Sequence, residues 1–416
     1  MPELALKGGP RAITLDDVEA FKWPQIGEEE VKAVTALLTR GELSISEETY
    51  IFEREFADYL DAKYALAHNN GTASIHAAFF AVGVGPGDEV ITPSYTYWAT
   101  AMPILSCNAI PVFAEVDPEN LCLDPEDVRK RITSQTKAII VVHLFGMPAE
   151  MDELMEIAHA NNLALIEDAS HAHGAEYRRK KIGAIGDIGC FSLQTSKLMI
   201  GGEGGVLVTN NQEYYERAVA LGHYERISKL SERYRIYAHT GFGWKYRISP
   251  LASAIARVQL RHLDERNAKR NANLSYLNHE LGKIRGIEPF ATPPYTKRTY
   301  YEYRVRFNPN ELNGISRDKL VEALQAEGAK VAAERYPLLH LQPVFQERNI
   351  YGKGCPFDCP HVKRKIFYEK GDLPVTESVQ ENILRVPTFP NAEKPLLDQY
   401  VDAFRKVAEN VDELLH

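Results

Sequence analysis

The sequence predicts an α/β protein in which a large domain with a mainly parallel sheet, covered by helices on both faces, precedes a smaller α+β domain. Three observations predict this. The chain has 416 residues, more than one compact core usually holds. Short apolar strands alternate with helical stretches through the first half. That alternation stops near Leu251, where a long helical region begins.

Two helices open the first half, over residues 28–40 and about 46–60. In the first helix, one face carries Val31, Val34, Leu37 and Leu38, and Gly41 follows as a stop. Seven short apolar strands are expected at 64–67, 89–92, 110–116, 138–142, 163–166, 189–191 and 206–209. Helices separate several of these strands, and one of them is opened by Asp124-Pro125. In such a sheet the ligand lies at the carboxyl ends of the strands.

The pattern in the second half of the sequence predicts a smaller α+β domain. A helix runs from Leu251 towards Lys283, and a strand at 300–307 follows. Helices are expected at 316–327 and about 395–415. The border lies within or just after the long helix, so the domains are placed at 1–265 and 266–416.

Composition excludes several classes of protein. The net charge of −9 disfavours a nucleic-acid surface, which needs clustered Lys and Arg. No apolar run reaches the roughly 20 residues that cross a bilayer, and the first residues lack the pattern of a secretory signal. The five cysteines are too few and too scattered for a disulfide framework. A reduced, cytoplasmic setting is therefore expected, without nucleic-acid or membrane partners.

Three clusters could carry chemistry. Asn69–Ser74 joins a strand to a helix, where backbone amides and hydroxyls suit a phosphate, although a capped helix without a ligand is the commoner explanation of such a pattern taken alone. Asp168 ends an apolar strand, which suits pairing with a protonated ring nitrogen or capping of the next residues. Lys197 stands between two apolar strands, just before the glycine-rich Gly201–Gly205. A lysine there could form a Schiff base, whereas most lysines are solvated surface charges.

The order of these clusters resembles the DegT/DnrJ/EryC1/StrS aminotransferase family of the fold type I pyridoxal-phosphate enzymes. The resemblance covers nearly the whole chain. Its motifs include Gly71-Thr72-Ala73-Ser74-Ile75-His76, Thr92-Pro93-Ser94-Tyr95-Thr96-Tyr97, Glu167-Asp168-Ala169-Ser170-His171-Ala172-His173-Gly174, Phe191-Ser192 to Lys197 with Gly202-Glu203-Gly204-Gly205, and Val386-Pro387-Thr388-Phe389-Pro390.

The resemblance implies a role for each matching residue. Lys197 falls on the Schiff-base lysine and Asp168 on the acid that pairs with the pyridine nitrogen. Tyr97 falls on the aromatic residue that stacks on the cofactor ring. Gly71, Thr72 and Ser192 fall on phosphate ligands. His171 replaces the commoner glutamine near the cofactor's phenolic oxygen, and Ser170 replaces the usual alanine. Lys245 resembles a residue that reaches the phosphate of the neighbouring subunit, which implies a homodimer with shared active sites.

The implied activity is a ping-pong transamination with the cofactor held on Lys197. Glutamine or glutamate would be the donor, and a keto sugar or cyclitol ketone the acceptor. Gln194 and the segment 299–303 are similar to the cyclitol enzymes, which favours a free cyclitol over a nucleotide-linked keto sugar. Two rival functions are a non-catalytic regulator and a pyridoxal-phosphate dehydratase. The retained Lys197 and Asp168 argue against the regulator. The retained Lys197 and the lack of a cysteine motif for an iron–sulfur cluster argue against the dehydratase.

Weaker signals remain. Cys355, Cys359 and His361 have a spacing that zinc sites use, but a fourth ligand is not evident, and an ordered loop near the substrate entrance is favoured. Trp98 and Trp244 are expected to be packing residues. Tyr336 and His340, in the segment Tyr336-Pro337-Leu338-Leu339-His340, are candidates for bordering the substrate pocket, and packing is an equal alternative.

Overall fold

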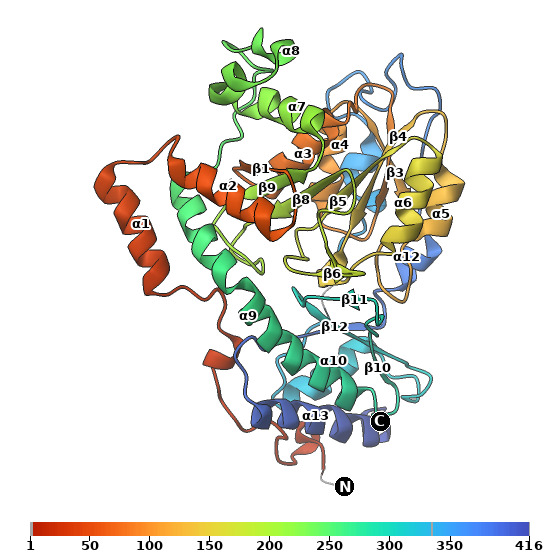
Figure 1. Cartoon of the computed structure of the whole chain (residues 1–416). Helices are drawn as coiled ribbons and strands as arrows, with labels where there is room; N and C mark the ends of the chain where they lie inside the picture. Colours follow the sequence, from red (N-terminus) through yellow and green to blue (C-terminus); the bar gives the residue numbers. More distant parts are fainter. Residues whose placement is uncertain (1–2, 334–335, 416) are drawn as a thin grey trace.

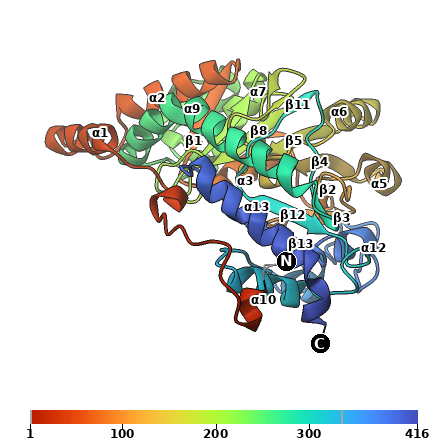
Figure 2. The same ribbon diagram turned by 90° about the horizontal axis from the view of Figure 1, so that it is seen from below.

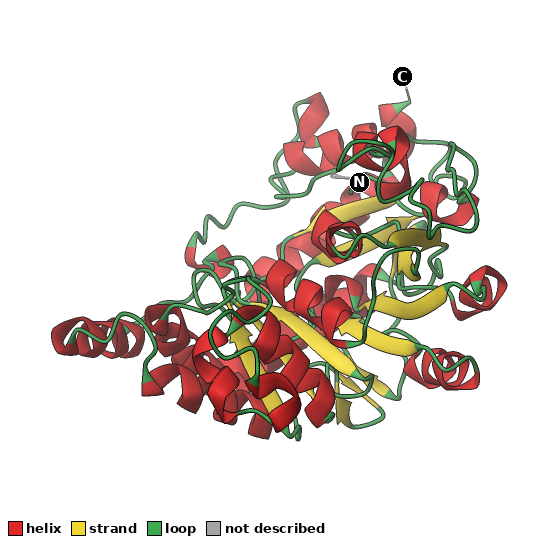
Figure 3. Cartoon of the chain, turned by 90° about the horizontal axis from the view of Figure 1, so that it is seen from above, coloured by secondary structure: helices red, strands yellow, loops and turns green. Residues whose placement is uncertain are grey.

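The computed structural model describes residues 3–333 and 336–415. The outer limits of the two predicted domains, residues 1 and 416, lie outside this range. A seven-stranded sheet forms the centre of the large domain, with helices on both faces (Figures 1 and 3). Its strand order is β1-β9-β8-β5-β4-β2-β3. The bounds are β1 Tyr64–His68, β2 Glu89–Pro93, β3 Ile110–Ala114, β4 Thr136–Val142, β5 Ala164–Asp168, β8 Ile188–Ser192 and β9 Gly205–Thr209.

The sheet is mainly parallel, as the sequence predicts. Strand β9 is the one of these seven that runs opposite to the other six, because it pairs antiparallel with both β1 and β8. The remaining pairs are parallel. All seven strands predicted from the sequence are present, with bounds that differ by a few residues. Their carboxyl ends, after His68, Pro93, Val142, Asp168 and Ser192, open towards one edge of the sheet.

Helices of the large domain sort onto two faces of the sheet. Apolar residues of α3, α4 and α7 pack on one face, and those of α2, α5, α6 and the start of α9 pack on the other. The bounds are α1 Glu28–Arg40, α2 Glu47–Tyr59, α3 Gly71–Ala81, α4 Met102–Ser106, α5 Pro125–Arg131, α6 Met151–Ala160, α7 Gln212–Gly222, α8 Glu232–Arg235 and α9 Pro250–Leu281. Both faces are thus covered, which explains why the strands are continuous apolar runs.

Helix α1 has the predicted bounds but does not bury the predicted face. Leu37 is 1% exposed, whereas Val31 and Leu38 are 61% and 53% exposed. Figure 1 shows α1 projecting from the body of the chain, in red at the left. The helix packs along α9, but Glu30 and Leu37 are its only buried side chains, so most of its apolar face is uncovered within this one chain.

The smaller domain is built on a three-stranded sheet of order β10-β12-β13. Its core includes apolar residues of α9, α10 and α13, and Figure 2 shows α9 and α13 side by side. The bounds are β10 Ile287–Pro289, β12 Tyr303–Phe307, α10 Arg317–Ala326, α11 Pro343–Glu347, α12 Pro374–Ser378, β13 Ile383–Val386 and α13 Lys394–Glu409. A third sheet of order β11-β6-β7 joins Thr296–Lys297 to Glu176–Tyr177 and Lys180–Lys181.

The border at 265/266 stays a prediction, and two segments pack across it. Leu4 and Ile13, from the start of the chain, belong to the core of the smaller domain. Leu338 and Phe345, from the second half, pack in the cores of the large domain. The second segment brings Tyr336 and its neighbours to the sheet edge where the strands end.

Candidate functional site

A cavity of about 520 Å³ lies at the carboxyl ends of the strands, and we call it the central cavity. Its walls come from the start of α3, the loop after β2, the ends of β4 and β5, and the loop after β8. The lining includes Gly71, Thr72, Thr96, Tyr97, Trp98, Thr100, Asp168, Ser170, His171, Ser192, Gln194, Lys197, Tyr301 and Tyr336. The position is the one expected for a ligand of a mainly parallel sheet.

One end of the central cavity is the N-terminus of α3. The side chain of Asn70 caps this helix and accepts a hydrogen bond from the backbone N–H of Ala73, at 2.8 Å. The amides of Gly71 and Thr72 precede the first intrahelical hydrogen bond, so they remain available to an anion. Gly71 also permits a close approach, because a Cβ there would lie 2.9 Å from the Cβ of Ser192. These features suit a phosphate group.

Asp168 supplies a carboxylate to the floor of the cavity. It ends β5 and is 5% exposed. The hydroxyl of Thr100 donates to its Oδ2 at 2.7 Å, and the backbone N–H of Ser170 donates to its Oδ1 at 3.2 Å. Each oxygen keeps a further lone pair, so the carboxylate is oriented and can still accept a proton donor from a ligand.

The neighbouring acid, Glu167, has a structural role instead. Adjacent residues of a strand point to opposite faces, so Glu167 turns away from Asp168. Its carboxylate accepts from the backbone amides of Gly183, Ile185 and Gly186 at 2.7–2.8 Å, and His143 lies 3.1 Å away. Burial opposes the charge, but the hydrogen bonds from His143 and these amides hold the pKa of Glu167 below its ordinary value. Glu167 therefore fixes the turn that follows Ile182.

Lys197 lines the same cavity as Asp168. Burial lowers the pKa of Lys197 to about 8, although the negative charges of Asp168 and Glu302 act in the opposite direction. The Nζ atom lies 4.2 Å from the ring centroid of Tyr301. An amine with this pKa is neutral in about a tenth of the molecules at pH 7. The neutral amine is the form that attacks a carbonyl carbon.

His171 is held as a neutral hydrogen-bond donor. Its ring stacks on Tyr301, with centroids 4.1 Å apart, and lies parallel to the ring of Phe145. Its Nδ1 accepts the backbone N–H of Phe145 at 3.3 Å, so the proton of the neutral ring is on Nε2. Burial, and then the charge of Lys197, lower the pKa of His171 well below its ordinary value. The side chain can therefore donate to a ligand oxygen without carrying charge.

The other candidate residues lie in different places. Tyr97 lines the cavity and is 49% exposed, so its ring is free to face a ligand. Tyr336 also lines it. His340 is buried behind the wall, where Nδ1 is bonded to Ser94 and Nε2 to Glu377. It is not among the lining residues of the central cavity. Lys245 is exposed and outside the cavity, with its Nζ 5.8 Å from the Tyr224 ring.

A second cavity of about 380 Å³ adjoins the first, and we call it the outer cavity. The two share Thr96, Tyr97, Trp98 and Tyr336. The outer cavity adds the charged residues Glu302 and Arg304. The expectation that Trp98 is a packing residue is wrong, because it is 48% exposed and lines both cavities.

Sequence reasoning missed two residues of the central cavity. Thr100 gave no signal of its own, since its partner Asp168 is distant in the sequence. Tyr301 was noted only as part of a segment similar to cyclitol enzymes, and its stacking on His171 could not be foreseen. Trp244 is 50% exposed and contacts His76 and Tyr246, outside the central cavity.

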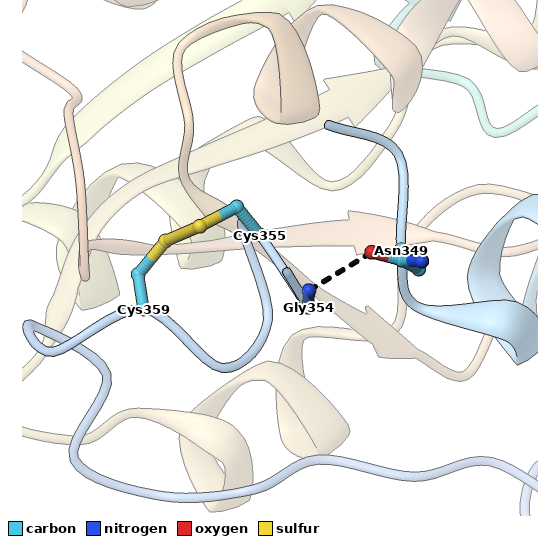
Figure 4. The surroundings of a disulfide bond; sticks show 4 residues. All are labelled: Asn349, Gly354, Cys355 and Cys359. Carbon is cyan, nitrogen blue, oxygen red and sulfur yellow. Dashed lines mark hydrogen bonds between the residues drawn. A yellow bond between two sulfur atoms is a disulfide. The ribbon is translucent and has the colours of Figure 1, made fainter. Parts of the chain in front are cut away.

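The cysteine-rich loop differs from its prediction. Cys355 and Cys359 form a disulfide, and the N–H of Gly354 donates to the side chain of Asn349 (Figure 4). Arg364, later in the loop, pairs with Glu89 at 2.6 Å. Glu89 begins β2, so this loop lies at the amino ends of the strands and not at the substrate entrance. The expectation that this loop lies near the substrate entrance is therefore wrong. The sequence could not predict its position, because the contact between Arg364 and Glu89 joins residues that are distant in the chain.

No cluster of three or more His, Cys, Asp or Glu side chains could hold a metal ion in residues 3–333 and 336–415. Within the same ranges, no helix combines the length and the apolar character that a membrane span requires.

Comparison with known proteins gives consistent matches. The sequence pattern of the DegT/DnrJ/EryC1/StrS aminotransferase family matches residues 24–357. L-glutamine:scyllo-inosose aminotransferase from Streptomyces griseus is 34% identical over 428 residues, which cover 99% of each chain. The dTDP-3-amino-3,4,6-trideoxy-alpha-D-glucose transaminase from Streptomyces venezuelae is 34% identical over 406 residues, 97% of this chain and 98% of the relative. The crystal structure of 3-amino-5-hydroxybenzoic acid synthase has a TM-score of 0.79 at 29% identity, covering 94% of this chain and 98% of that one.

Proposed function

This chain belongs to the DegT/DnrJ/EryC1/StrS aminotransferase family, and from that premise we propose that it moves an amino group from glutamine or glutamate to a keto sugar or cyclitol ketone. The chain is a pyridoxal-phosphate-dependent aminotransferase. One observation of the structure supports the assignment most: the amine of Lys197, with its pKa lowered to about 8, shares a cavity with the carboxylate of Asp168 and the N-terminus of α3.

The residues of the central cavity fit pyridoxal phosphate. Gly71 and Ser192 lie in close contact, because a Cβ on Gly71 would be 2.9 Å from the Cβ of Ser192, and the cradle that they form offers amides and hydroxyls to a phosphate. Asp168 can pair with a protonated ring nitrogen, and Nε2 of His171 can donate to a phenolic oxygen. Tyr97 presents an exposed ring that can stack on the cofactor. The phosphate, the ring and the carbonyl group of the cofactor thus each have a partner of suitable chemistry, the last of them in the amine of Lys197.

When bound, pyridoxal phosphate supplies a carbonyl carbon that reacts with amines and a ring that accepts electrons. Asp168 stabilises positive charge on the ring nitrogen, held in its orientation by Thr100 and Ser170. Nζ of Lys197, once free, takes a proton from the α-carbon of the donor and later returns one. The faces of Tyr301 and His171 keep water from that amine on one side.

The choice of substrates is supported by the relatives. The Streptomyces griseus relative is named for glutamine as donor and scyllo-inosose as acceptor. The Streptomyces venezuelae relative is named for a dTDP-linked sugar at the same identity, so a nucleotide-linked keto sugar is the second candidate acceptor. Gln194, which lines the central cavity, belongs to the segment that is similar to cyclitol enzymes and favours the first candidate.

We also propose a homodimer with shared active sites. Val31 and Leu38 expose an apolar face on the projecting helix α1, and Ile236, Phe242 and Trp244 expose another apolar group. Lys245 follows Trp244 and is outside its own chain's central cavity. A second copy that covers these surfaces would allow Lys245 to reach the partner's phosphate site. The cytoplasmic location expected from the sequence stays a prediction.

The proposal is tested by the visible absorbance of the purified protein. Pyridoxal phosphate bound through a lysine gives a visible band, and glutamine or glutamate should shift it to the shorter wavelength of the aminated cofactor. Addition of the ketone acceptor should restore the band. A protein without any band after addition of pyridoxal phosphate would refute the assignment of Lys197.

A further inference from the structure

We propose that Glu302 recognises the amino acceptor, by accepting hydrogen bonds from the hydroxyl groups of an uncharged, polyhydroxylated ring in the outer cavity. The inference rests on the proposed aminotransferase function and adds the subsite and the residue that would decide which ketones react.

The outer cavity is placed to hold the part of an acceptor that does not react. Tyr97, Trp98 and Tyr336 line both cavities, so a ligand in the outer cavity continues into the central one. Glu302 is near enough to Lys197 for its negative charge to act on the amine. A ring bound against Glu302 would therefore present its carbonyl towards the reacting amine.

The carboxylate of Glu302 is held at one oxygen and open at the other. Its Oε2 accepts from both Nε and Nη2 of Arg304. Both hydrogen bonds that the structure gives for Glu302 within residues 3–333 and 336–415 use this oxygen, which leaves Oε1 as an acceptor. The side chain is 18% exposed, so it is held in place yet reachable from the cavity.

Arg304 orients this carboxylate from behind. It is 3% exposed, and its guanidinium lies 4.8 Å from the ring centroid of Phe145. Since the two nitrogens of its fork grip one carboxylate oxygen, the direction of Oε1 is fixed. Arg304 is a positioning residue in this arrangement, and Glu302 makes the contact.

The chemistry of the outer cavity fits a neutral polyol ring. A carboxylate oxygen accepts hydroxyl protons, and aromatic side chains pack against the C–H faces of a ring. Tyr97 and Trp98 supply such faces, and both are about half exposed. The Glu302–Arg304 pair has no net charge. A diphosphate would bring two negative charges towards Glu302, which disfavours it in this cavity.

The first test is a binding measurement that does not depend on turnover. Isothermal titration calorimetry of the enzyme loaded with pyridoxal phosphate would use scyllo-inositol, a ring polyol without a ketone. We expect Glu302→Gln to weaken its binding by about 10-fold or more, because the amide oxygen can keep both hydrogen bonds from Arg304 while an NH2 group replaces the anionic acceptor Oε1. Trp98→Ala, at a half-exposed position, should also weaken binding, whereas Trp98→Phe should restore most of it.

A matched control is available in the same domain. Glu288 pairs with Arg306 at 3.5 Å, and neither residue lines the outer cavity. Glu288→Gln should leave the binding of scyllo-inositol unchanged. Equal binding by wild-type enzyme and Glu302→Gln, or no binding to the wild type at millimolar concentration, would overturn the proposal. Displacement of scyllo-inositol by dTDP would assign the cavity to a nucleotide and would also overturn it.

The second test separates the two half-reactions. In Glu302→Gln we expect the KM for the ketone acceptor to rise about 10-fold. The absorbance change with glutamine should stay within about two-fold of wild type when it is measured well above pH 8, where loss of the Glu302 charge changes the protonation of Lys197 little. Slowing of the glutamine step alone would mean that Glu302 serves the donor, against the proposal. The glutamine step of the wild type tests the aminotransferase function itself, and the calorimetry does not need that step, so the two failures are distinguishable.

Discussion

The hydroxyl of Thr100 donates a hydrogen bond of 2.7 Å to Oδ2 of Asp168. The same hydroxyl lies 3.0 Å from that of Thr96, so a short chain of hydroxyl groups orients the carboxylate at the floor of the central cavity. We predict that Thr100→Val lowers the rate constant of each half-reaction by about 10-fold or more, because a hydrogen bond to the charged carboxylate of Asp168 is lost. Stopped-flow absorbance with glutamine, and then with the acceptor, measures the two steps.

Thr49→Val provides the control for that experiment. Thr49 is also buried, and its hydroxyl bonds to Ser253, outside the central cavity. The control should lose stability without losing rate. If both variants slowed alike, the effect of Thr100 would be one of folding and not of orientation.

Lys197→Ala should abolish turnover, with a loss of more than about 1,000-fold in kcat, because the amine that moves the proton is gone. The variant should still bind pyridoxal phosphate at the α3 end, as an equilibrium titration would show, but without the band of a lysine-bound cofactor. Retained steady-state activity would be incompatible with the assigned role. Lys353→Ala, at an exposed position outside the central cavity, is the control.

Attachment of pyridoxal phosphate to the cofactor-free enzyme should speed up with pH and level off above about 8. The pKa of Lys197 is lowered to about 8, and only the neutral amine attacks the carbonyl. Below that pH the amine is protonated and attachment slows. Asp168→Asn removes a charge that raises this pKa, so its profile should shift to lower pH. The visible band followed over a pH series measures both profiles, and a midpoint near the ordinary value for lysine would contradict the burial of the amine.

Gly71→Ala should weaken the binding of pyridoxal phosphate by about 10-fold or more, because overpacking of this kind costs roughly 1–3 kcal/mol. The added Cβ would meet the Cβ of Ser192 at 2.9 Å. Gly85→Ala is the matched control, since no heavy atom lies within 4 Å of its Cβ position. Dissociation constants from fluorescence titration would compare them. Similar values for the two variants would show that the cradle does not hold the phosphate.

The shared active site predicts complementation between two defective subunits. Lys245→Ala should weaken cofactor binding, and Lys197→Ala should be inactive. A heterodimer of the two, purified through two different tags, would rebuild one intact site from Lys197 of one subunit and Lys245 of the other. Its activity should approach half that of the wild type. Activity no greater than half that of the Lys245→Ala homodimer would place Lys245 outside the neighbouring site.

The sequence predicts the seven strands of the main sheet because each is a local signal, an apolar run bounded by turn residues. The bounds of α1 are predicted for the same reason, by Gly41 and a clear periodicity. That periodicity does not say what covers the apolar face, and so the exposure of Val31 and Leu38 could not be predicted. The short strands at 176–177 and 180–181 contain too few residues to show any period.

The candidate site also combines features that the local sequence predicts with features that it does not. Asp168 is marked by its position at a strand end and Lys197 by the glycine-rich stretch that follows it between two strands, and both lie in the central cavity. The link from Thr100 to Asp168, the stack of Tyr301 on His171 and the outer cavity all join residues distant in the sequence. Their partners are set by the folding of the chain as a whole, which no local pattern encodes. The loop with Cys355 was misplaced for this reason.

Helix α9 has 32 residues, and it belongs to two cores at once. Ala256 and Leu263 are buried with the sheet, whereas Leu274 and Leu281 are buried with the smaller domain. An α-helix of this length is a rod of about 48 Å. Rotation of one domain against the other would have to bend the rod or pull it out of one core. The part of the site built by the sheet and the part built by Glu302 are thus kept at a fixed spacing. We therefore expect substrates to enter and leave through movements of side chains and loops at the cavity mouth, without rotation of the domains.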